Sequence, residues 1–148
     1  VHPQSVIHSM VEFTDGATIA QASPPDMRLP IALGLTWPER LHDVEKPLTW
    51  VDAQSWTFEP VDSDTFPAIN LARHAVASSP THTAVYNAAN EVFVDAFLAK
   101  KLPWLGIVDS LTKVVESHDG IADPTLDDIL GVEEWACAQA NALVSSGS

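Results

Sequence analysis

The pattern of apolar and polar residues over the first forty positions predicts two strands followed by a short helix. Val, Ile and Phe are concentrated in the first strand and fall on both of its faces, which indicates burial on both sides. The strands meet at Asp15-Gly16, a dipeptide typical of a tight hairpin turn. Asp26 is a suitable N-cap for the helix, which Trp37-Pro38 ends. The expected elements are strands over 5–14 and 17–22 and a helix over 27–35.

The next stretch, residues 41–65, is predicted to be an irregular connection. Trp50, Trp56 and Phe58 lie there among prolines and acidic residues. Large aromatic side chains need apolar surroundings, so we expect them to attach this connection to the surface of other elements. Polar and aromatic residues alternate over 55–59, which favours one edge strand.

Beyond residue 66, apolar residues recur every three or four positions, as they do along one face of a helix. Thr81 or Thr83 is expected to cap the second of four helices. Asp123 or Thr125 is expected to cap the last, in which Gly131 is a candidate break. Because the intervening loops are short, the helices should be antiparallel neighbours. They are expected over 66–78, from 81 or 83 to 101, over 104–118, and from about 125 to 144.

The fold class that follows is α+β: a β-hairpin or partial sheet with a short helix, then a C-terminal four-helix bundle. The composition changes near residue 66 from proline-rich to alanine-rich. We therefore divide the chain into three parts, residues 1–40, 41–65 and 66–148. The first strand begins almost at residue 1 with no preceding loop, from which we expect the chain to be a piece of something larger.

The charge of the chain limits the classes of molecule that we expect it to bind. Twenty acidic residues against seven basic ones give a net charge of −13, which repels phosphate backbones and anionic lipids, so neither nucleic acid nor a membrane is an expected partner. No apolar run approaches the roughly 20 residues needed to cross a bilayer. The single cysteine, Cys137, excludes an internal disulfide and suits a reducing cytoplasm. It lies between alanines, where a small hydrophobic side chain is expected rather than a nucleophile.

Among single residues, His8 is the strongest candidate for chemistry. It lies mid-strand in apolar surroundings, where an imidazole needs hydrogen-bond partners and can be tuned near neutral pH. From spacing alone, a satisfied core histidine is the favoured alternative. His2 lies on the same face of a regular strand, about 20 Å away, which is too far for one metal ion to bridge.

Two polar clusters each have a structural alternative. Asp43-Val44-Glu45 has the spacing of an oxygen-ligand pair for Mg²⁺ or Mn²⁺, but it reads as a solvated acidic turn. Asn87, Asn90 and Glu91 share a helical face, and we favour amide bonds to a loop or a neighbouring domain over ligand binding. Asp127-Asp128 is interpreted as charge that favours a helix start.

The chain has no Gly-x-Gly-x-x-Gly, P-loop, His-Glu-x-x-His or Gly-x-Ser-x-Gly motif, so on these residues it is not a self-contained enzyme.

Three motifs in order resemble one family, 1-deoxy-D-xylulose 5-phosphate reductoisomerase of the non-mevalonate isoprenoid pathway, over nearly the whole chain. They are His2-Pro3-Gln4-Ser5-Val6-Ile7-His8-Ser9-Met10-Val11 with Asp15-Gly16; Pro25-Asp26-Met27-Arg28-x-Pro30-Ile31 with Trp37-Pro38-x-Arg40; and Asn87-Ala88-Ala89-Asn90-Glu91 with Ala96-Phe97-Leu98.

The resemblance implies an enzyme that isomerises a ketose phosphate and reduces the resulting aldehyde with NADPH, using Mg²⁺ or Mn²⁺. It also implies that residues 1–40 end the catalytic domain and 66–148 form the C-terminal helical bundle. In it, His8 matches an active-site histidine, and Met27 with Pro25 matches the apolar wall over the substrate. The NADPH domain, the metal-binding carboxylates and the phosphate contacts are expected upstream of Val1, so this chain alone should bind no cofactor and be inactive.

The hairpin matches the sheet through which two subunits of the family pair, which implies a homodimer. A different class of function remains open: a non-catalytic dimerisation or scaffold module, because an apolar strand pair is a template for pairing with another chain.

Overall fold

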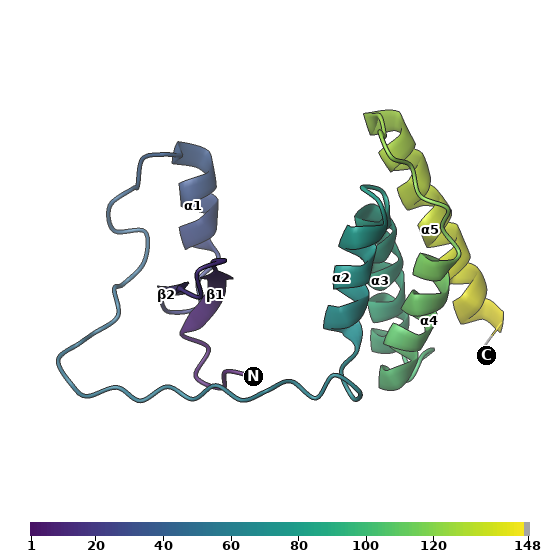
Figure 1. Ribbon diagram of the computed structural model, residues 1–148. Coiled ribbons are helices and arrows are strands. Elements are labelled where there is room, and N and C mark those ends of the chain that lie inside the picture. The colour runs from purple at the N-terminus through teal and green to yellow at the C-terminus, as the bar shows by residue number, and fades with distance from the viewer. Residues whose placement is uncertain (147–148) are drawn as a thin grey trace. The chain divides into compact units, whose positions relative to one another are not determined.

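The computed structural model describes residues 1–146 and, within them, contains two strands and five helices (Figure 1). The elements belong to two compact units, Val1–Val61 and Asp62–Ser148. The first contains the hairpin, one helix and a long irregular segment, and the second contains four helices. This arrangement confirms the predicted α+β class. The three-part domain division stays a prediction.

The predicted hairpin is present, with shorter strands than expected. β1 (Ile7–Glu12) pairs antiparallel with β2 (Thr18–Ala22). Gly16 has φ +89°, a left-handed conformation that a glycine adopts without strain, and Ala17 N donates to Asp15 Oδ1 at 2.9 Å. The strands are short because the residues on either side of Asp15-Gly16 belong to the turn.

The first helix begins with the predicted aspartate. α1 (Arg28–Thr36) follows Met27, and the Arg28 amide donates to Asp26 Oδ1 at 2.8 Å, so this carboxylate caps the helix one position before its formal N-cap. The helix ends before Trp37-Pro38, as expected.

The predicted edge strand over 55–59 is wrong, because no strand forms there. The segment hydrogen-bonds to the start of the chain largely through side chains: Thr57 N donates to Gln4 Oε1 at 3.2 Å, and the Gln4 amide donates to Thr57 Oγ1 at 3.0 Å. The Phe58 ring stacks on His2 with centroids 4.5 Å apart. Val1 and Glu59 exchange one pair of backbone bonds, with Glu59 N donating to the Val1 carbonyl oxygen at 2.9 Å, but the other bonds between the segments involve side chains, so no continuous backbone ladder forms.

The hydrophobic core lies entirely in the second unit. α3 (His82–Leu98) contacts all three of its neighbours, which are α2 (Ala68–Ser78), α4 (Trp104–Glu116) and α5 (Leu126–Ser146) (Figure 1). Phe93 at the centre of α3 is fully buried. The core is completed by apolar residues at helical spacing: Leu71, Ala75, Val85, Ala88, Ala89, Ile107, Leu111, Val114, Val115, Val132, Ala136 and Ala140.

The last helix begins with a reciprocal cap and continues without a break. Thr125 Oγ1 accepts the Asp128 amide at 3.2 Å, and Asp128 Oδ2 accepts the Thr125 amide at 2.9 Å. This is a capping box, so Thr125 rather than Asp123 is the cap. Gly131 lies inside the continuous α5, so the candidate break there is wrong.

At the start of α3, Thr81 has a different task from the predicted cap. It occupies the N-cap position of α3 but makes no side-chain cap bond. Its fully buried hydroxyl bonds His118 Nε2 at 2.8 Å and accepts the Ile121 amide at 3.0 Å. The His82 and His118 rings meet edge to face with centroids 4.9 Å apart. This polar cluster ties the start of α3 to the loop between α4 and α5.

The burial of Phe93 predicts the stability of the bundle. Phe93→Ala should lower the free energy of unfolding by about 3–5 kcal/mol, because it removes buried apolar surface and leaves a cavity. Phe66→Ala is the matched control, since Phe66 is half exposed, and should cost less than about 1 kcal/mol. Urea unfolding followed by far-UV circular dichroism measures both. Equal losses would contradict the placement of Phe93.

The His118 ring makes the bundle sensitive to acid. Burial, and secondarily the neighbouring His82, lowers the pKa of His118 below its ordinary value of 6.5, while Asp119 opposes the shift. The unfolded chain therefore binds a proton at a pH where the folded ring does not, so stability should fall as the pH drops below 6.5. Denaturant midpoints across this range should show a shallower slope in His118→Asn than in His74→Asn, a control at an exposed histidine of α2.

Candidate functional site

A cavity of about 500 Å³ in the first unit brings the predicted site residues together. His8 comes from β1, Pro25 and Met27 come from the turn before α1, and Leu29, Pro30 and Leu33 come from α1 itself. The remaining lining residues are Ser9, Gln21, Ser23, Asp26 and Arg40. Residues separated by more than thirty positions thus share one cavity.

A β-bulge positions His8. Ile7 lies opposite Ala22 and Ser9 lies opposite Gln21, so His8 is the extra residue between two paired positions. A bulge turns a side chain out of the regular alternation and is common beside active sites. His8 is exposed rather than buried, so it is not the satisfied core histidine that spacing favoured.

His2 contributes to structure and not to the cavity. Its two ring nitrogens are occupied by the Thr57 carbonyl oxygen, at 2.9 Å, and by the Val6 amide, at 3.1 Å. Neither nitrogen is left for a metal ion. The histidines of the first motif therefore have separate tasks.

Met27 and Pro25 form an apolar part of the cavity wall. Met27 is 71% exposed, so its side chain is available to a bound molecule. The turn that carries both residues lies between two prolines at its start and α1 at its end. The backbone of the apolar wall is therefore held in place, and its side chains remain available to a bound molecule.

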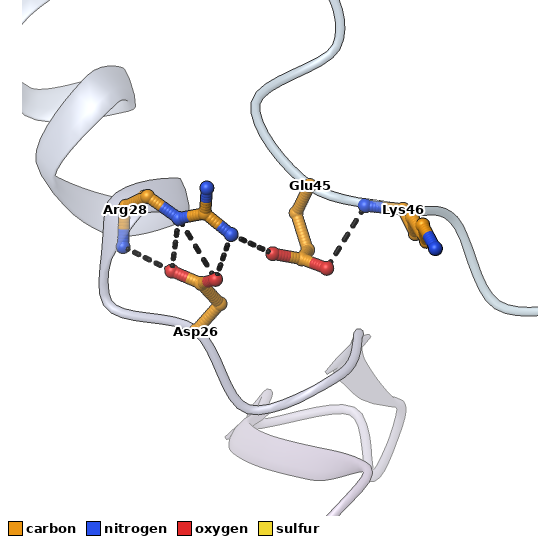
Figure 2. A network of polar contacts seen from close by, with 4 residues as sticks. All are labelled: Asp26, Arg28, Glu45 and Lys46. Atoms are coloured by element: carbon orange, nitrogen blue, oxygen red, sulfur yellow. Dashed lines mark hydrogen bonds and ion pairs between the residues drawn. The ribbon is translucent and has the colours of Figure 1, made fainter.

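Asp26 and Arg28, on either side of Met27, belong to an ion-pair network that spacing did not predict (Figure 2). The Arg28 guanidinium donates to both carboxylate oxygens of Asp26 and to Glu45 Oε2, the last at 2.7 Å. Glu45 Oε1 accepts the Lys46 amide at 2.9 Å. Hydrogen bonds from Arg28 hold the pKa of Asp26 well below its usual range, and Asp26 raises the pKa of Arg28.

The network corrects the interpretation of Asp43-Val44-Glu45 as a solvated turn. Glu45 is half-buried and paired with Arg28, while Asp43 takes no part in the network. Among residues 1–146 no cluster of three or more His, Cys, Asp or Glu could hold a metal ion. The residues that the structure describes therefore do not fit a metal centre, at this pair or elsewhere.

The asparagine motif has a role within its own helix. Asn87 Nδ2 donates to Glu91 Oε1 at 3.1 Å, one turn along α3, so the expected bond from Asn87 to a loop or another domain is not the one formed. Cys137 is half-buried against the core, with its sulfur 3.9 Å from the Ala88 carbonyl oxygen, as expected of a small hydrophobic side chain. Asp128 belongs to the capping box described above.

A second cavity of about 520 Å³ lies in the helical unit, between the segment 64–68, α3 and α4. Its polar lining includes Asp64, Asp109 and Asn90, and it has neither a histidine nor a basic residue. The cavity of the first unit contains both, in His8 and Arg40, and is the better candidate for acid–base or anion chemistry. No helix within the described residues is long and apolar enough to span a membrane.

Known proteins similar to the chain agree with the motifs. The family of the DXP reductoisomerase C-terminal domain matches residues 22–139. The 1-deoxy-D-xylulose 5-phosphate reductoisomerase of Beutenbergia cavernae is 56% identical over 149 residues, covering 99% of this chain and 38% of the relative. The enzyme of Bifidobacterium longum is 61% identical over 119 residues, covering 80% of this chain and 30% of the relative. The chain thus spans well under half the length of these relatives.

Solved structures give the same assignment at the level of the fold. The reductoisomerase of Zymomonas mobilis in complex with NADPH matches with a TM-score of 0.81 and 41% identity, over 97% of this chain and 38% of that one. A DOX-P reductoisomerase in complex with NADPH, fosmidomycin and magnesium matches with a TM-score of 0.79 and 34% identity, over the same shares.

Proposed function

The chain belongs to the DXP reductoisomerase family, through its C-terminal domain, and from that membership we propose that it forms part of the active site of such an enzyme. The whole enzyme converts 1-deoxy-D-xylulose 5-phosphate to 2-C-methyl-D-erythritol 4-phosphate with NADPH, in isoprenoid biosynthesis. The observation that carries the proposal is the cavity that His8, Pro25 and Met27 share. These are the positions that the motifs assign to the site.

Each side chain has a distinct role in this proposal. His8, exposed at the bulge, faces the reacting polar groups and orients them by hydrogen bonds during isomerisation. Met27 and Pro25 cover the apolar part of the sugar phosphate and exclude water from it. Binding and orientation are thus the contributions of this chain.

The cofactors are proposed to bind outside these residues. Similar structures contain NADPH and magnesium, whereas the described part of this chain has no cluster fit for a metal. We therefore assign NADPH and Mg²⁺ or Mn²⁺ to the rest of the enzyme. The isolated chain should be inactive. A cytoplasmic location is proposed from the single unpaired cysteine. The net charge of −13 is the ground for proposing neither nucleic acid nor membrane as a partner.

A chimera tests the role of His8. Residues 1–148 replace the matching segment of the Beutenbergia cavernae enzyme, and turnover is followed as oxidation of NADPH with substrate and Mg²⁺. The chimera should be active, and His8→Asn should lower kcat/KM by about 100-fold or more, because an active-site imidazole typically contributes that much.

The matched control is His42→Asn, at an exposed histidine of the same unit that does not line the cavity. It should leave turnover within about twofold. Equal activity of the His8 and His42 variants would refute the assignment. Turnover by the isolated 148-residue chain would show that the site is complete without the rest of the enzyme.

The second candidate function, dimerisation through the sheet, rests on the exposure of the hairpin. Met10, Val11 and Ile19 are 50%, 57% and 64% exposed, and no residue of the first unit is buried, although all of its residues are described. A two-stranded sheet without a core is marginal in water, so an apolar partner surface would stabilise it. We propose a second copy of the chain as that partner.

Sedimentation equilibrium tests this pairing. At micromolar concentration the chain should show twice its mass of 16.0 kDa, and Val11→Asp should shift it to the monomer by placing a charge on the apolar strand. Val51→Asp is the control, at an even more exposed valine of the connecting segment. A monomeric parent chain would exclude dimerisation by this unit alone.

A further inference from the structure

The turn that carries Met27 is tied to a distant part of the chain by one side chain. The Arg28 guanidinium lies between Asp26, two residues before it, and Glu45, seventeen residues after it. The Lys46 amide then donates to the second oxygen of Glu45. We call Asp26, Arg28 and Glu45 the Arg28 network (Figure 2).

The network includes one residue of the cavity wall. Asp26 lies between Pro25 and Met27 in the sequence, and all three line the cavity that contains His8. Glu45 and Lys46 line a smaller, neighbouring cavity of about 350 Å³, which shares Ser23 and Leu29 with the first. The bond from Arg28 to Glu45 thus ties the turn that lines one cavity to the segment that lines the other.

The network also changes the charge that a bound molecule meets. Asp26 is the one carboxylate of the cavity lining, and both of its oxygens accept hydrogen bonds from Arg28. The other ionisable lining residues are His8 and Arg40, and neither is an acid. Arg28 carries one positive charge against the two carboxylates of Asp26 and Glu45, so the network keeps a net charge of −1, but hydrogen bonds from Arg28 occupy both Asp26 oxygens and weaken the repulsion that an anion meets there.

We propose that Arg28 and Glu45 are positioning residues for the substrate wall. They hold the Pro25–Met27 turn in place and keep the Asp26 carboxylate paired, so that a phosphorylated substrate can bind against it. This inference rests on the proposed function. Neither residue touches the reacting atoms, so their effect should fall on binding rather than on the chemical step.

The exposure of Arg28 separates this role from a purely structural one. The Arg28 side chain is 68% exposed, and an ion pair with one such exposed partner contributes little to stability because water screens it, although the Asp26 and Glu45 side chains are 22% and 16% exposed. Variants of the network should therefore stay folded. A change in KM without a change in unfolding midpoint is a result that a stabilising role alone does not predict.

The experiment uses the chimeric enzyme described above, with Glu45→Gln and Arg28→Leu. Both should raise KM for the sugar phosphate by about 5- to 10-fold and leave kcat within about twofold. Glu39→Gln is the matched control, since its carboxylate lies outside the network, and should change neither constant. Glu45→Asp keeps the charge and should recover part of the loss. The double variant should be no worse than Arg28→Leu alone, because both act through one network.

Hydrogen exchange gives a readout that does not depend on activity. Peptides covering residues 23–36 should exchange faster in Glu45→Gln than in Glu39→Gln, because the substitution weakens the bond between Arg28 and residue 45 that holds the turn. Unchanged exchange in Glu45→Gln overturns the proposal whatever the activity. A fall in kcat at constant KM overturns it as well. An inactive parent chimera with faster exchange in Glu45→Gln would refute the proposed function while supporting the positioning role.

Discussion

The absence of any buried side chain from residues 1–61, all of which are described, is the constraint on which the site depends. Burial of apolar surface is the main force that fixes a fold, and it is not available here within the unit itself. Within this chain, the hairpin and the turn before α1 are held largely by local polar geometry. Gly16 supplies the left-handed turn, Asp15 and Asp26 accept backbone amides, and Arg28 links two segments.

The helical unit has the opposite character, and the contrast bears on function. Phe93 and its neighbours form a closed core around α3, and the polar atoms of the Thr81 cluster are paired with one another. Such a unit resists local opening, whereas a unit held by exposed hydrogen bonds opens at low cost. The candidate site lies in the second kind of unit. A wall that must close over a substrate is suited to that place, provided that something limits its freedom, and the Arg28 network does so.

The parts of the fold that local sequence determines were predictable. Asp15-Gly16 identified the hairpin, apolar spacing identified the four later helices, and Thr125 was one of two expected caps. Apart from the break expected at Gly131, the main failures share one cause, which is a choice of partner made across the chain. The bulge at His8 depends on which residues of β2 lie opposite, and Thr81 bonds His118, which lies 37 positions away, instead of capping its helix.

The candidate site divides in the same way. His8, Pro25 and Met27 followed from motifs that occur in order, and the cavity unites them. Glu45 was assigned to a solvated turn, because no residue near it in the sequence indicates that it pairs with an arginine seventeen residues earlier. The Glu45 carboxylate, which the sequence suggests is solvated, thus binds Arg28 and ties the turn before α1 to a distant segment.

Local pairing, rather than net charge, decides whether this surface accepts an anion. A net charge of −13 disfavours the approach of a phosphorylated molecule, but salt screens that field over about 8 Å at physiological ionic strength. The charges on the cavity lining are nearest to a bound molecule, so they matter more than the distant ones. There the Asp26 carboxylate is occupied by Arg28, and Arg40 adds an unopposed cation to the same lining. Within this acidic protein, the pairing of Asp26 with Arg28 and the charge of Arg40 thus weaken the repulsion that an anion meets at the wall.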